Sequence, residues 1–174
     1  ETEEADAYLT KFAKAMRMTL ENSEEKEVPL ADDLKALELY MQLEAKRLNH
    51  KFTYEIKVDE DIDPETALVP PLLFQPFVEN SIWHGISKKE GKGHILVQIK
   101  KEDEMLRCII EDDGVGRGEA ATAKLPAEKR SLGMKITKAR IDLLNKTKGG
   151  NASVSLKDKP QGVEAELLLP LLTI

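Results

Sequence analysis

The stretch ENSIWHG, residues 79–85, places polar side chains at the end of an apolar run that begins LLFQPFV. Asn80 and His84 are four residues apart, so on a helix they share one face. A neutral amide oxygen such as that of Asn80 can ligate Mg²⁺, which normally bridges phosphates and keeps several water ligands. Taken alone, the segment favours a plainer interpretation, in which Asn80 lies on a solvated face of a core helix and His84 caps or packs its end.

A second stretch, EDDGVGRG at residues 111–118, has an acid at the end of an expected strand and then glycines two residues apart. Glycine lets the backbone bend and lets a ligand approach the chain closely. Asp112 could accept a hydrogen bond from an exocyclic amine. A ligand-binding turn and an ordinary flexible turn both remain open. A calcium loop is disfavoured, because glycine directly follows the acids and no glutamate closes a twelve-residue frame.

The third stretch, SLGMKITKARI at residues 131–141, puts Gly133 at an expected helix start. Free backbone N–H groups at a helix N-terminus attract phosphate. In isolation, a small residue at an N-cap is the simpler interpretation.

Composition bounds the class of protein. The 174 residues are 41% hydrophobic and 33% charged, which fits one globular domain with or without a helical appendage. The net charge of -6 disfavours nucleic acid and anionic membranes as partners. Cys108 is the only cysteine, which suits a reducing compartment. We find no signal peptide and no apolar run near the ~20 residues of a membrane helix, and the start ETEEADAYL suggests a piece of a longer protein.

Apolar residues spaced three and four apart predict four helices, over residues 5–21, 34–48, 70–86 and 133–146. The second is expected to be capped by Asp32 or Asp33, just after Pro29. The first has an apolar face that little else in the chain would cover.

Alternation with a period of two predicts strands over residues 52–58, 95–99, 106–110, 154–156 and 163–169. KKEDE and KDKPQG read as hairpin turns, and residues 113–131 as a mobile loop. Because the strands are mostly joined by hairpins, we expect an α+β fold: a two-layer sandwich with helices on one face of a mostly antiparallel mixed sheet, and an N-terminal helical extension.

Together, QPFVENSIWHG and DDGVG at this separation, followed by glycine at a helix start, resemble the GHKL (Bergerat-type) ATP-binding fold of histidine kinases and DNA gyrase. More narrowly, PPLLFQPFVENSIWHGI and the preceding EVPLADDLKALELYMQLEAKRLNHKFTYEI are similar to the LytS-like sensor histidine kinases. The resemblance covers nearly the whole chain.

The resemblance implies ATP and Mg²⁺ as ligands. Asn80 would ligate the magnesium against the phosphates, and Asp112 would receive the adenine amino group. Gly114 and Gly116 would let the backbone pass near the base, and residues 117–131 would form a lid. Further nucleotide contacts are implied for His84, Lys129, Arg130, Gly133, Met134 and Lys135.

The implied chemistry is transfer of the γ-phosphoryl group of ATP to a histidine in a PHFLFN-like segment, a setting that His50, His84 and His94 lack. We therefore expect residues 1–26 to be the C-terminal part of the dimerisation helices and residues 27–174 the catalytic domain, with the acceptor on the missing dimerisation helix. Implied partners are a response regulator and a second copy in a full-length homodimer. The implied location is a cytoplasmic domain of a parent anchored in the inner membrane.

Two alternatives remain. One is a degenerate nucleotide-binding module that regulates a partner through dimer contacts without phosphotransfer. The other is a chaperone- or topoisomerase-type ATPase, which is disfavoured by the short length and by Pro76, where hydrolytic relatives carry a glutamate. Glu79 adjoins Asn80 but would point about 100° away around the helix.

Overall fold

The computed structural model describes residues 27–117 and 132–174, with the backbone alone for residues 132–136. Of the N-terminal stretch it describes residues 3–4, 7–8, 10–12, 14–15 and 18. These N-terminal residues are helical, as the spacing over residues 5–21 predicts.

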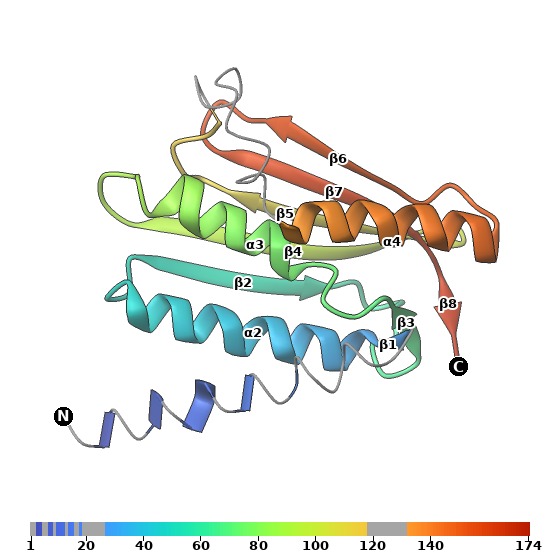
Figure 1. Ribbon diagram of the computed structural model, residues 1–174, viewed down its shortest axis with the longest axis horizontal. Coiled ribbons are helices and arrows are strands. Elements are labelled where there is room, and N and C mark those ends of the chain that lie inside the picture. The colour runs from blue at the N-terminus through green and yellow to red at the C-terminus, as the bar shows by residue number, and fades with distance from the viewer. Residues whose placement is uncertain are drawn as a thin grey trace.

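A five-stranded sheet forms one layer of the molecule, behind the helices in the view of Figure 1. Its order is β2 (Phe52–Val58), β4 (Gly93–Glu102), β5 (Met105–Asp112), β7 (Val163–Pro170) and β6 (Ser153–Asp158). The β2–β4 pair is parallel and the other three pairs are antiparallel. This confirms the mostly antiparallel mixed sheet, and each predicted strand lies within an observed one.

The helices lie together on one side of this sheet (Figure 1). They are α2 (Leu30–Arg47), α3 (Gln75–Asn80), the π-helix η1 (Ser81–Ile86) and α4 (Leu132–Lys148). Between the layers lies one apolar core, to which the inward residues of β4 and β5 contribute Ile95, Val97, Ile99, Leu106, Cys108 and Ile110. Burying each large side chain of this kind contributes about 1.5–3 kcal/mol, so the core fixes how the helices sit on the sheet.

A small second sheet at one end of the molecule joins β1 (Val28–Pro29), β3 (Ala67–Val69) and β8 (Leu172–Thr173) in the order β1-β3-β8 (Figure 1). No pattern in the sequence predicts this second sheet. Strands of two or three residues are too short to show an alternating pattern.

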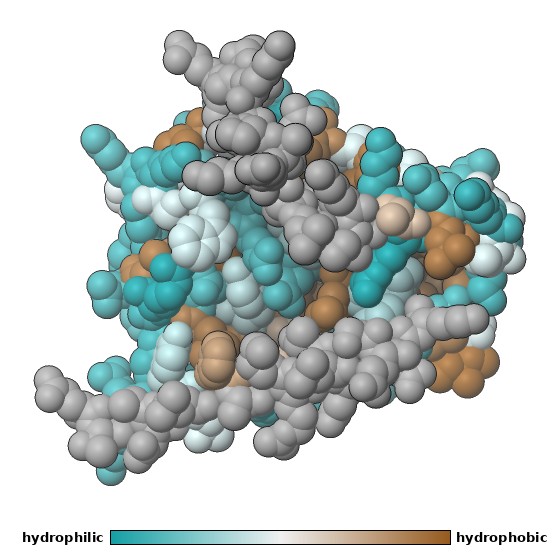
Figure 2. Space-filling view, viewed as in Figure 1, coloured by the Kyte–Doolittle hydropathy of each residue, from teal (hydrophilic) through white to brown (hydrophobic). Residues whose placement is uncertain are grey.

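On the described part of the helix-bearing side, polar residues dominate and hydrophobic residues form separate small areas (Figure 2). Within the described residues, no helix is long and apolar enough to cross a membrane.

The predicted cap of α2 is wrong. The helix begins at Leu30, directly after Pro29, and no side-chain hydrogen bond caps it. Asp32 and Asp33 therefore lie inside the first turn, where negative charge is favourable near the helix N-terminus. Asp33 is buried and binds a backbone N–H from another segment instead.

The single helix predicted over residues 70–86 is also wrong in detail. Regular helix begins only at Gln75, because Pro70 and Pro71 have no N–H to donate and Leu72 adopts a left-handed φ of 58°. After Asn80 the helix widens into η1, a π-helix of six residues. Such wide turns are rare and often occur at functional sites.

Candidate nucleotide site

Asp112 is the last residue of β5. Side chains of a strand alternate between the two faces, so Asp112 shares the helix-covered face with Leu106, Cys108 and Ile110. It is only 3% exposed, and its Oδ1 accepts a hydrogen bond from the N–H of Gly114 at 2.9 Å. Within the described residues, the structure gives Oδ2 no hydrogen bond, so this oxygen could accept one from a ligand.

Gly114 lies directly against Gly85 of η1. A Cβ on Gly114 would come within 2.4 Å of the Gly85 backbone, and one on Gly85 would lie 3.0 Å from Asp112 Oδ1. The N–H of Val115 donates to the carbonyl of Gly85 at 3.2 Å. Two glycines from separate stretches of the sequence therefore let the end of β5 pack onto η1. Gly85 is a site residue that the sequence analysis did not single out.

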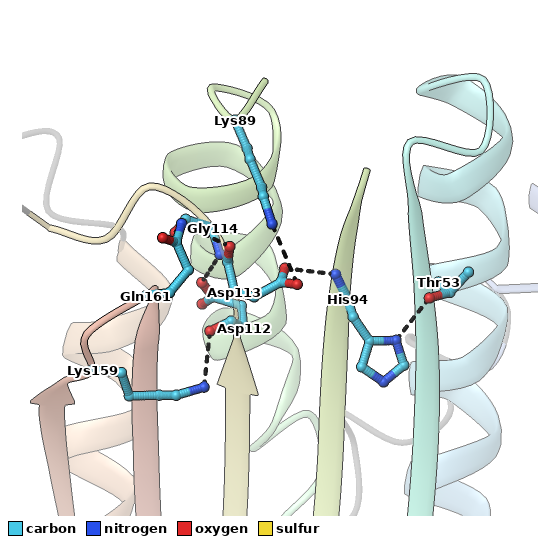
Figure 3. A network of polar contacts seen from close by, with 8 residues as sticks. All are labelled: Thr53, Lys89, His94, Asp112, Asp113, Gly114, Lys159 and Gln161. Carbon is cyan, nitrogen blue, oxygen red and sulfur yellow. Dashed lines mark hydrogen bonds and ion pairs between the residues drawn. The ribbon is translucent and has the colours of Figure 1, made fainter. Parts of the chain in front are cut away.

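The β6–β7 turn closes the other side of this segment. Gly162, with φ of 91°, packs so tightly on Asp112 that a Cβ would lie 1.9 Å from its carbonyl oxygen. Gln161 Nε2 donates to the carbonyl of Gly114 at 2.7 Å, and Lys159 Nζ donates to that of Asp112 at 3.3 Å (Figure 3). Gly116 has a φ of 78°, which glycine tolerates best.

The sequence analysis read this turn only as a hairpin connection. Gly162 was the available signal, because a glycine at the start of a strand marks either a turn or a close backbone approach. Its approach to Asp112 depends on the β5–β7 pairing, which the local sequence does not reveal.

Asp113 points away from Asp112 and fastens the same turn to the start of β4 (Figure 3). Its Oδ1 accepts the N–H of His94 at 2.7 Å, and Lys89 Nζ lies 3.3 Å from Oδ2. The His94 ring is turned toward Thr53, with 2.7 Å between Nδ1 and Oγ1. These contacts fix the backbone of the turn on the side away from the Asp112 carboxylate.

Asn80 ends α3, and its side chain is half-buried. In the part of the chain that the structure describes, its carboxamide makes no hydrogen bond, so its oxygen is available to a cation. His84 lies in η1 with its side chain exposed. No contact within the described residues joins either side chain to Asp112 directly; the link is the Gly85–Gly114 packing.

Beside these residues, Trp83 is 51% exposed and the guanidinium of Arg47 lies 4.4 Å from its ring centroid. Such a cation–π contact ties η1 to the end of α2. Tyr40 lies in the same region, and burial together with the charges of Glu44 and Glu79 raises the pKa of its hydroxyl.

Gly133, Met134 and Lys135 lie in the first turn of α4, as predicted. The N–H groups of a first turn have no partner within their helix, so this backbone could bind phosphate. Lys129 and Arg130, and most of the predicted lid, lie outside the described residues.

Two buried titratable groups lie in the core rather than at this site. Burial raises the pKa of the Cys108 thiol, which is therefore a poor nucleophile. Burial also raises the pKa of Asp33 to about 6, against the opposing effects of the Leu72 N–H and the Arg140 charge.

Among the described residues, no group of three or more His, Cys, Asp or Glu could hold a metal, so any cation would need ligands of another kind.

Comparison with known proteins gives a family match and several related sequences. The family model described as Histidine kinase matches residues 1–52. Sensor protein LytS of Oceanobacillus iheyensis is 33% identical over 119 residues, which are 67% of this chain and 20% of that protein. Sensor protein LytS of Staphylococcus epidermidis is 25% identical over 163 residues, 94% of this chain and 25% of that protein. The chain thus spans a fifth to a quarter of the length of these relatives.

A solved structure supports the fold independently. The histidine kinase domain of the Erythrobacter litoralis EL346 blue-light activated histidine kinase matches with a TM-score of 0.57 at 16% identity, covering 94% of this chain and 75% of that one. The family match, the LytS relatives and this shared fold agree with the GHKL-type sheet. The chain belongs to the LytS-like histidine kinases.

Proposed function

We propose that this chain is the ATP-binding catalytic part of a two-component sensor histidine kinase. It would transfer the γ-phosphoryl group of ATP to a histidine on the dimerisation helix of its parent protein. The observation that carries this proposal is the buried Asp112 at the end of β5, packed through Gly114 and Gly85 against the helix that follows Asn80. Residues 27–174 would be the catalytic domain and residues 1–26 the end of the dimerisation helices.

Each part of the site has a role suited to its chemistry. Asp112 would accept a hydrogen bond from the adenine amino group through Oδ2, while Gly114 and Gly116 would let the backbone pass near the base. Asn80, with His84 one turn on, would face the phosphates, and Asn80 would ligate Mg²⁺ through a carboxamide that makes no hydrogen bond in the described chain. The first turn of α4, from Gly133 to Lys135, would bind phosphate through its N–H groups. Lys129 and Arg130 would add positive charge.

A magnesium ion held by Asn80 would neutralise negative charge on the ATP phosphates. Asn80 fits this use, because magnesium takes oxygen ligands and is usually held by only one or two protein groups beside phosphates and water.

The parent would act as a homodimer, pass its phosphoryl group to a response regulator and be anchored in the inner membrane with this domain in the cytoplasm. The names of its relatives, which are sensor proteins, support a role of the parent in signalling.

Binding of Mg–ATP is the first test, with Asn80→Ala as the variant. We expect the wild type to bind Mg–ATP in titration calorimetry. Asn80→Ala should lose about tenfold of the magnesium-dependent part of that affinity and keep its affinity for adenosine, because it removes one metal ligand. Gln98→Ala, which removes a carboxamide from β4, is the matched control and should bind as the wild type does. No heat and no thermal shift at millimolar ATP in the wild type would overturn the proposal.

Phosphoryl transfer is the second test. Transfer depends on placing a nucleophile in line with the γ-phosphate, and the three histidines of this chain lack the expected setting. Incubation with γ-labelled ATP should therefore give acid-labile label on the longer parent protein and none on this chain alone. Label mapped to His50, His84 or His94 would contradict the expectation. Label on neither protein, despite ATP binding, would favour a degenerate nucleotide-binding module.

A further inference from the structure

One peptide group ahead of α3 is held at both of its polar ends by side chains from other helices. The N–H of Leu72 donates to Oδ1 of Asp33, in the first turn of α2, at 2.9 Å. The carbonyl of Pro71, which belongs to the same peptide group, accepts a hydrogen bond from Nη1 of Arg140 on α4. We call this arrangement the Asp33–Arg140 bracket.

The bracketed peptide lies where the chain turns into α3. Leu72 has a left-handed φ of 58°, which is unfavourable for a non-glycine residue and needs support from its surroundings. The next two side chains, Leu73 and Phe74, are fully buried, and Gln75 begins α3. The position of this peptide therefore fixes where α3 starts, and Asn80 lies one short helix further on.

Burying the Asp33 carboxylate between the helices is unfavourable, because the carboxylate loses its hydration. Asp33 is only 3% exposed, and a buried carboxylate is stable only when hydrogen bonds and an opposite charge compensate its lost hydration. The Leu72 N–H and the Arg140 charge act in this way on Asp33. An apolar pair would fill the same space without that cost, so the side chains are better explained by what they hold.

We infer that Asp33 and Arg140 are positioning residues that set α3, and through it Asn80, relative to α2 and α4. The inference rests on the proposed function, because it gives Asn80 the magnesium. It deepens that function by linking the metal ligand to α4, whose first turn would bind the phosphates. A shift of this one peptide would move Asn80 relative to that helix start.

The protein carries its own reporter of this geometry. Trp83 is the only tryptophan, lies three residues beyond Asn80 on η1 and stacks with Arg47 of α2 at 4.4 Å. A displacement of α3 and η1 against α2 changes that stacking, and with it the Trp83 emission, whether or not nucleotide is bound.

The test compares variants that remove the hydrogen bond with variants that keep it. Arg140→Met and Asp33→Leu remove the donor and the acceptor; Arg140→Gln and Asp33→Asn retain them without charge. For each variant, folding is checked by circular dichroism, and Trp83 emission and the affinities for Mg–ATP and adenosine are measured. Arg107→Met, which removes an arginine paired with Glu102 and Glu166 on the sheet, is the control.

We expect Arg140→Met and Asp33→Leu to change the Trp83 emission. Their magnesium-dependent ATP affinity should fall about tenfold, whereas their affinity for adenosine should change less than about twofold. Arg140→Gln and Asp33→Asn should restore both readouts, and the control should match the wild type. If Asp33→Leu does not fold, Arg140→Met decides the test, because Arg140 is only half-buried.

Two results would overturn the inference. One is unchanged emission and unchanged Mg–ATP affinity in a folded Arg140→Met protein. The other is an equal loss of ATP and adenosine affinity, which would indicate general damage to the fold. A wild type that binds no ATP would refute the proposed function instead, and the Trp83 emission would then decide on the bracket alone.

Discussion

At the scale of single residues, the Asp112 carboxylate has one structural contact and one proposed use in ligand binding. Its Oδ1 holds the Gly114 N–H inside the fold, and Oδ2 is left for a ligand. The sequence predicts the ligand-binding half of this, because an acid between a strand and glycines is a recognisable pattern. It does not predict the structural half, which depends on how closely Gly114 folds back.

The two uses can be separated by Asp112→Asn. A carboxamide oxygen can still accept the Gly114 N–H, so the fold should hold, while its NH₂ group faces the adenine amino group with a donor instead of an acceptor. We expect ATP affinity to fall about tenfold and the preference for ATP over GTP to shrink, as titrations of both nucleotides would show.

Asp112→Ala is the comparison for this prediction. It should bind ATP poorly and also lose about 1–3 kcal/mol of stability in urea unfolding, because the buried Gly114 N–H is left without an acceptor. An Asp112→Asn protein with the wild-type preference for ATP over GTP would show that Asp112 serves the fold alone.

At the scale of elements, the sequence predicts the strands and helices with a regular apolar period and misses the local irregularities of the backbone. Five strands and the long helices α2 and α4 follow from periods of two and of about 3.6 residues. The left-handed Leu72 and the π-helix η1 leave no periodic trace, so the segment over residues 70–86 reads as one helix. The contact of Gly162 with Asp112 joins residues fifty apart and follows only from strand pairing.

That contact gives a prediction for the β6–β7 turn. Gly162→Ala forces a Cβ against the Asp112 carbonyl oxygen and strains a backbone with φ of 91°. Gly91→Ala is the matched control, since its φ of 80° is similar and nothing lies within 4 Å of the new Cβ. Positive φ costs about 1–3 kcal/mol in both. The steric overlap of the new Cβ should lower the free energy of unfolding of Gly162→Ala, measured in urea, by about 2 kcal/mol more than that of Gly91→Ala. Equal losses would mean that the turn moves aside freely.

At the scale of the whole molecule, the core joins segments that are distant in the sequence. Asp33, the peptide at residues 71–72 and Arg140 meet between α2, α3 and α4. Nothing in the local sequence marks Asp33 as buried, because an aspartate in the first turn of a helix is ordinarily a solvated residue. The sequence could therefore predict the layers, the place of Asp112 at a strand end and that of Gly133 at a helix start, but not the charge buried between the layers.

This buried charge makes the stability of the molecule depend on pH. The pKa of Asp33 is raised from 3.8 to about 6 in the folded protein, chiefly by burial. The folded state then holds a proton that the unfolded state has released, so this contribution to stability is complete below pH 3.8 and is lost as the pH rises through 6. The difference between the two pKa values corresponds to about 3 kcal/mol.

Asp33→Asn keeps the acceptor for Leu72 and cannot ionise. Its free energy of unfolding, measured by urea titrations followed by circular dichroism between pH 4 and pH 7, should therefore gain about 2 kcal/mol relative to the wild type as the pH rises. The gain is smaller than the full difference, because the Asp33 carboxyl of the unfolded chain is already partly ionised at pH 4. Because both proteins share every other titratable group, taking the difference between them removes the other contributions, including that of Asp158, whose pKa the Arg117 side chain lowers. A difference that stays constant over this range would mean that Asp33 titrates alike in the folded and unfolded chain, and that its burial costs the molecule nothing at neutral pH.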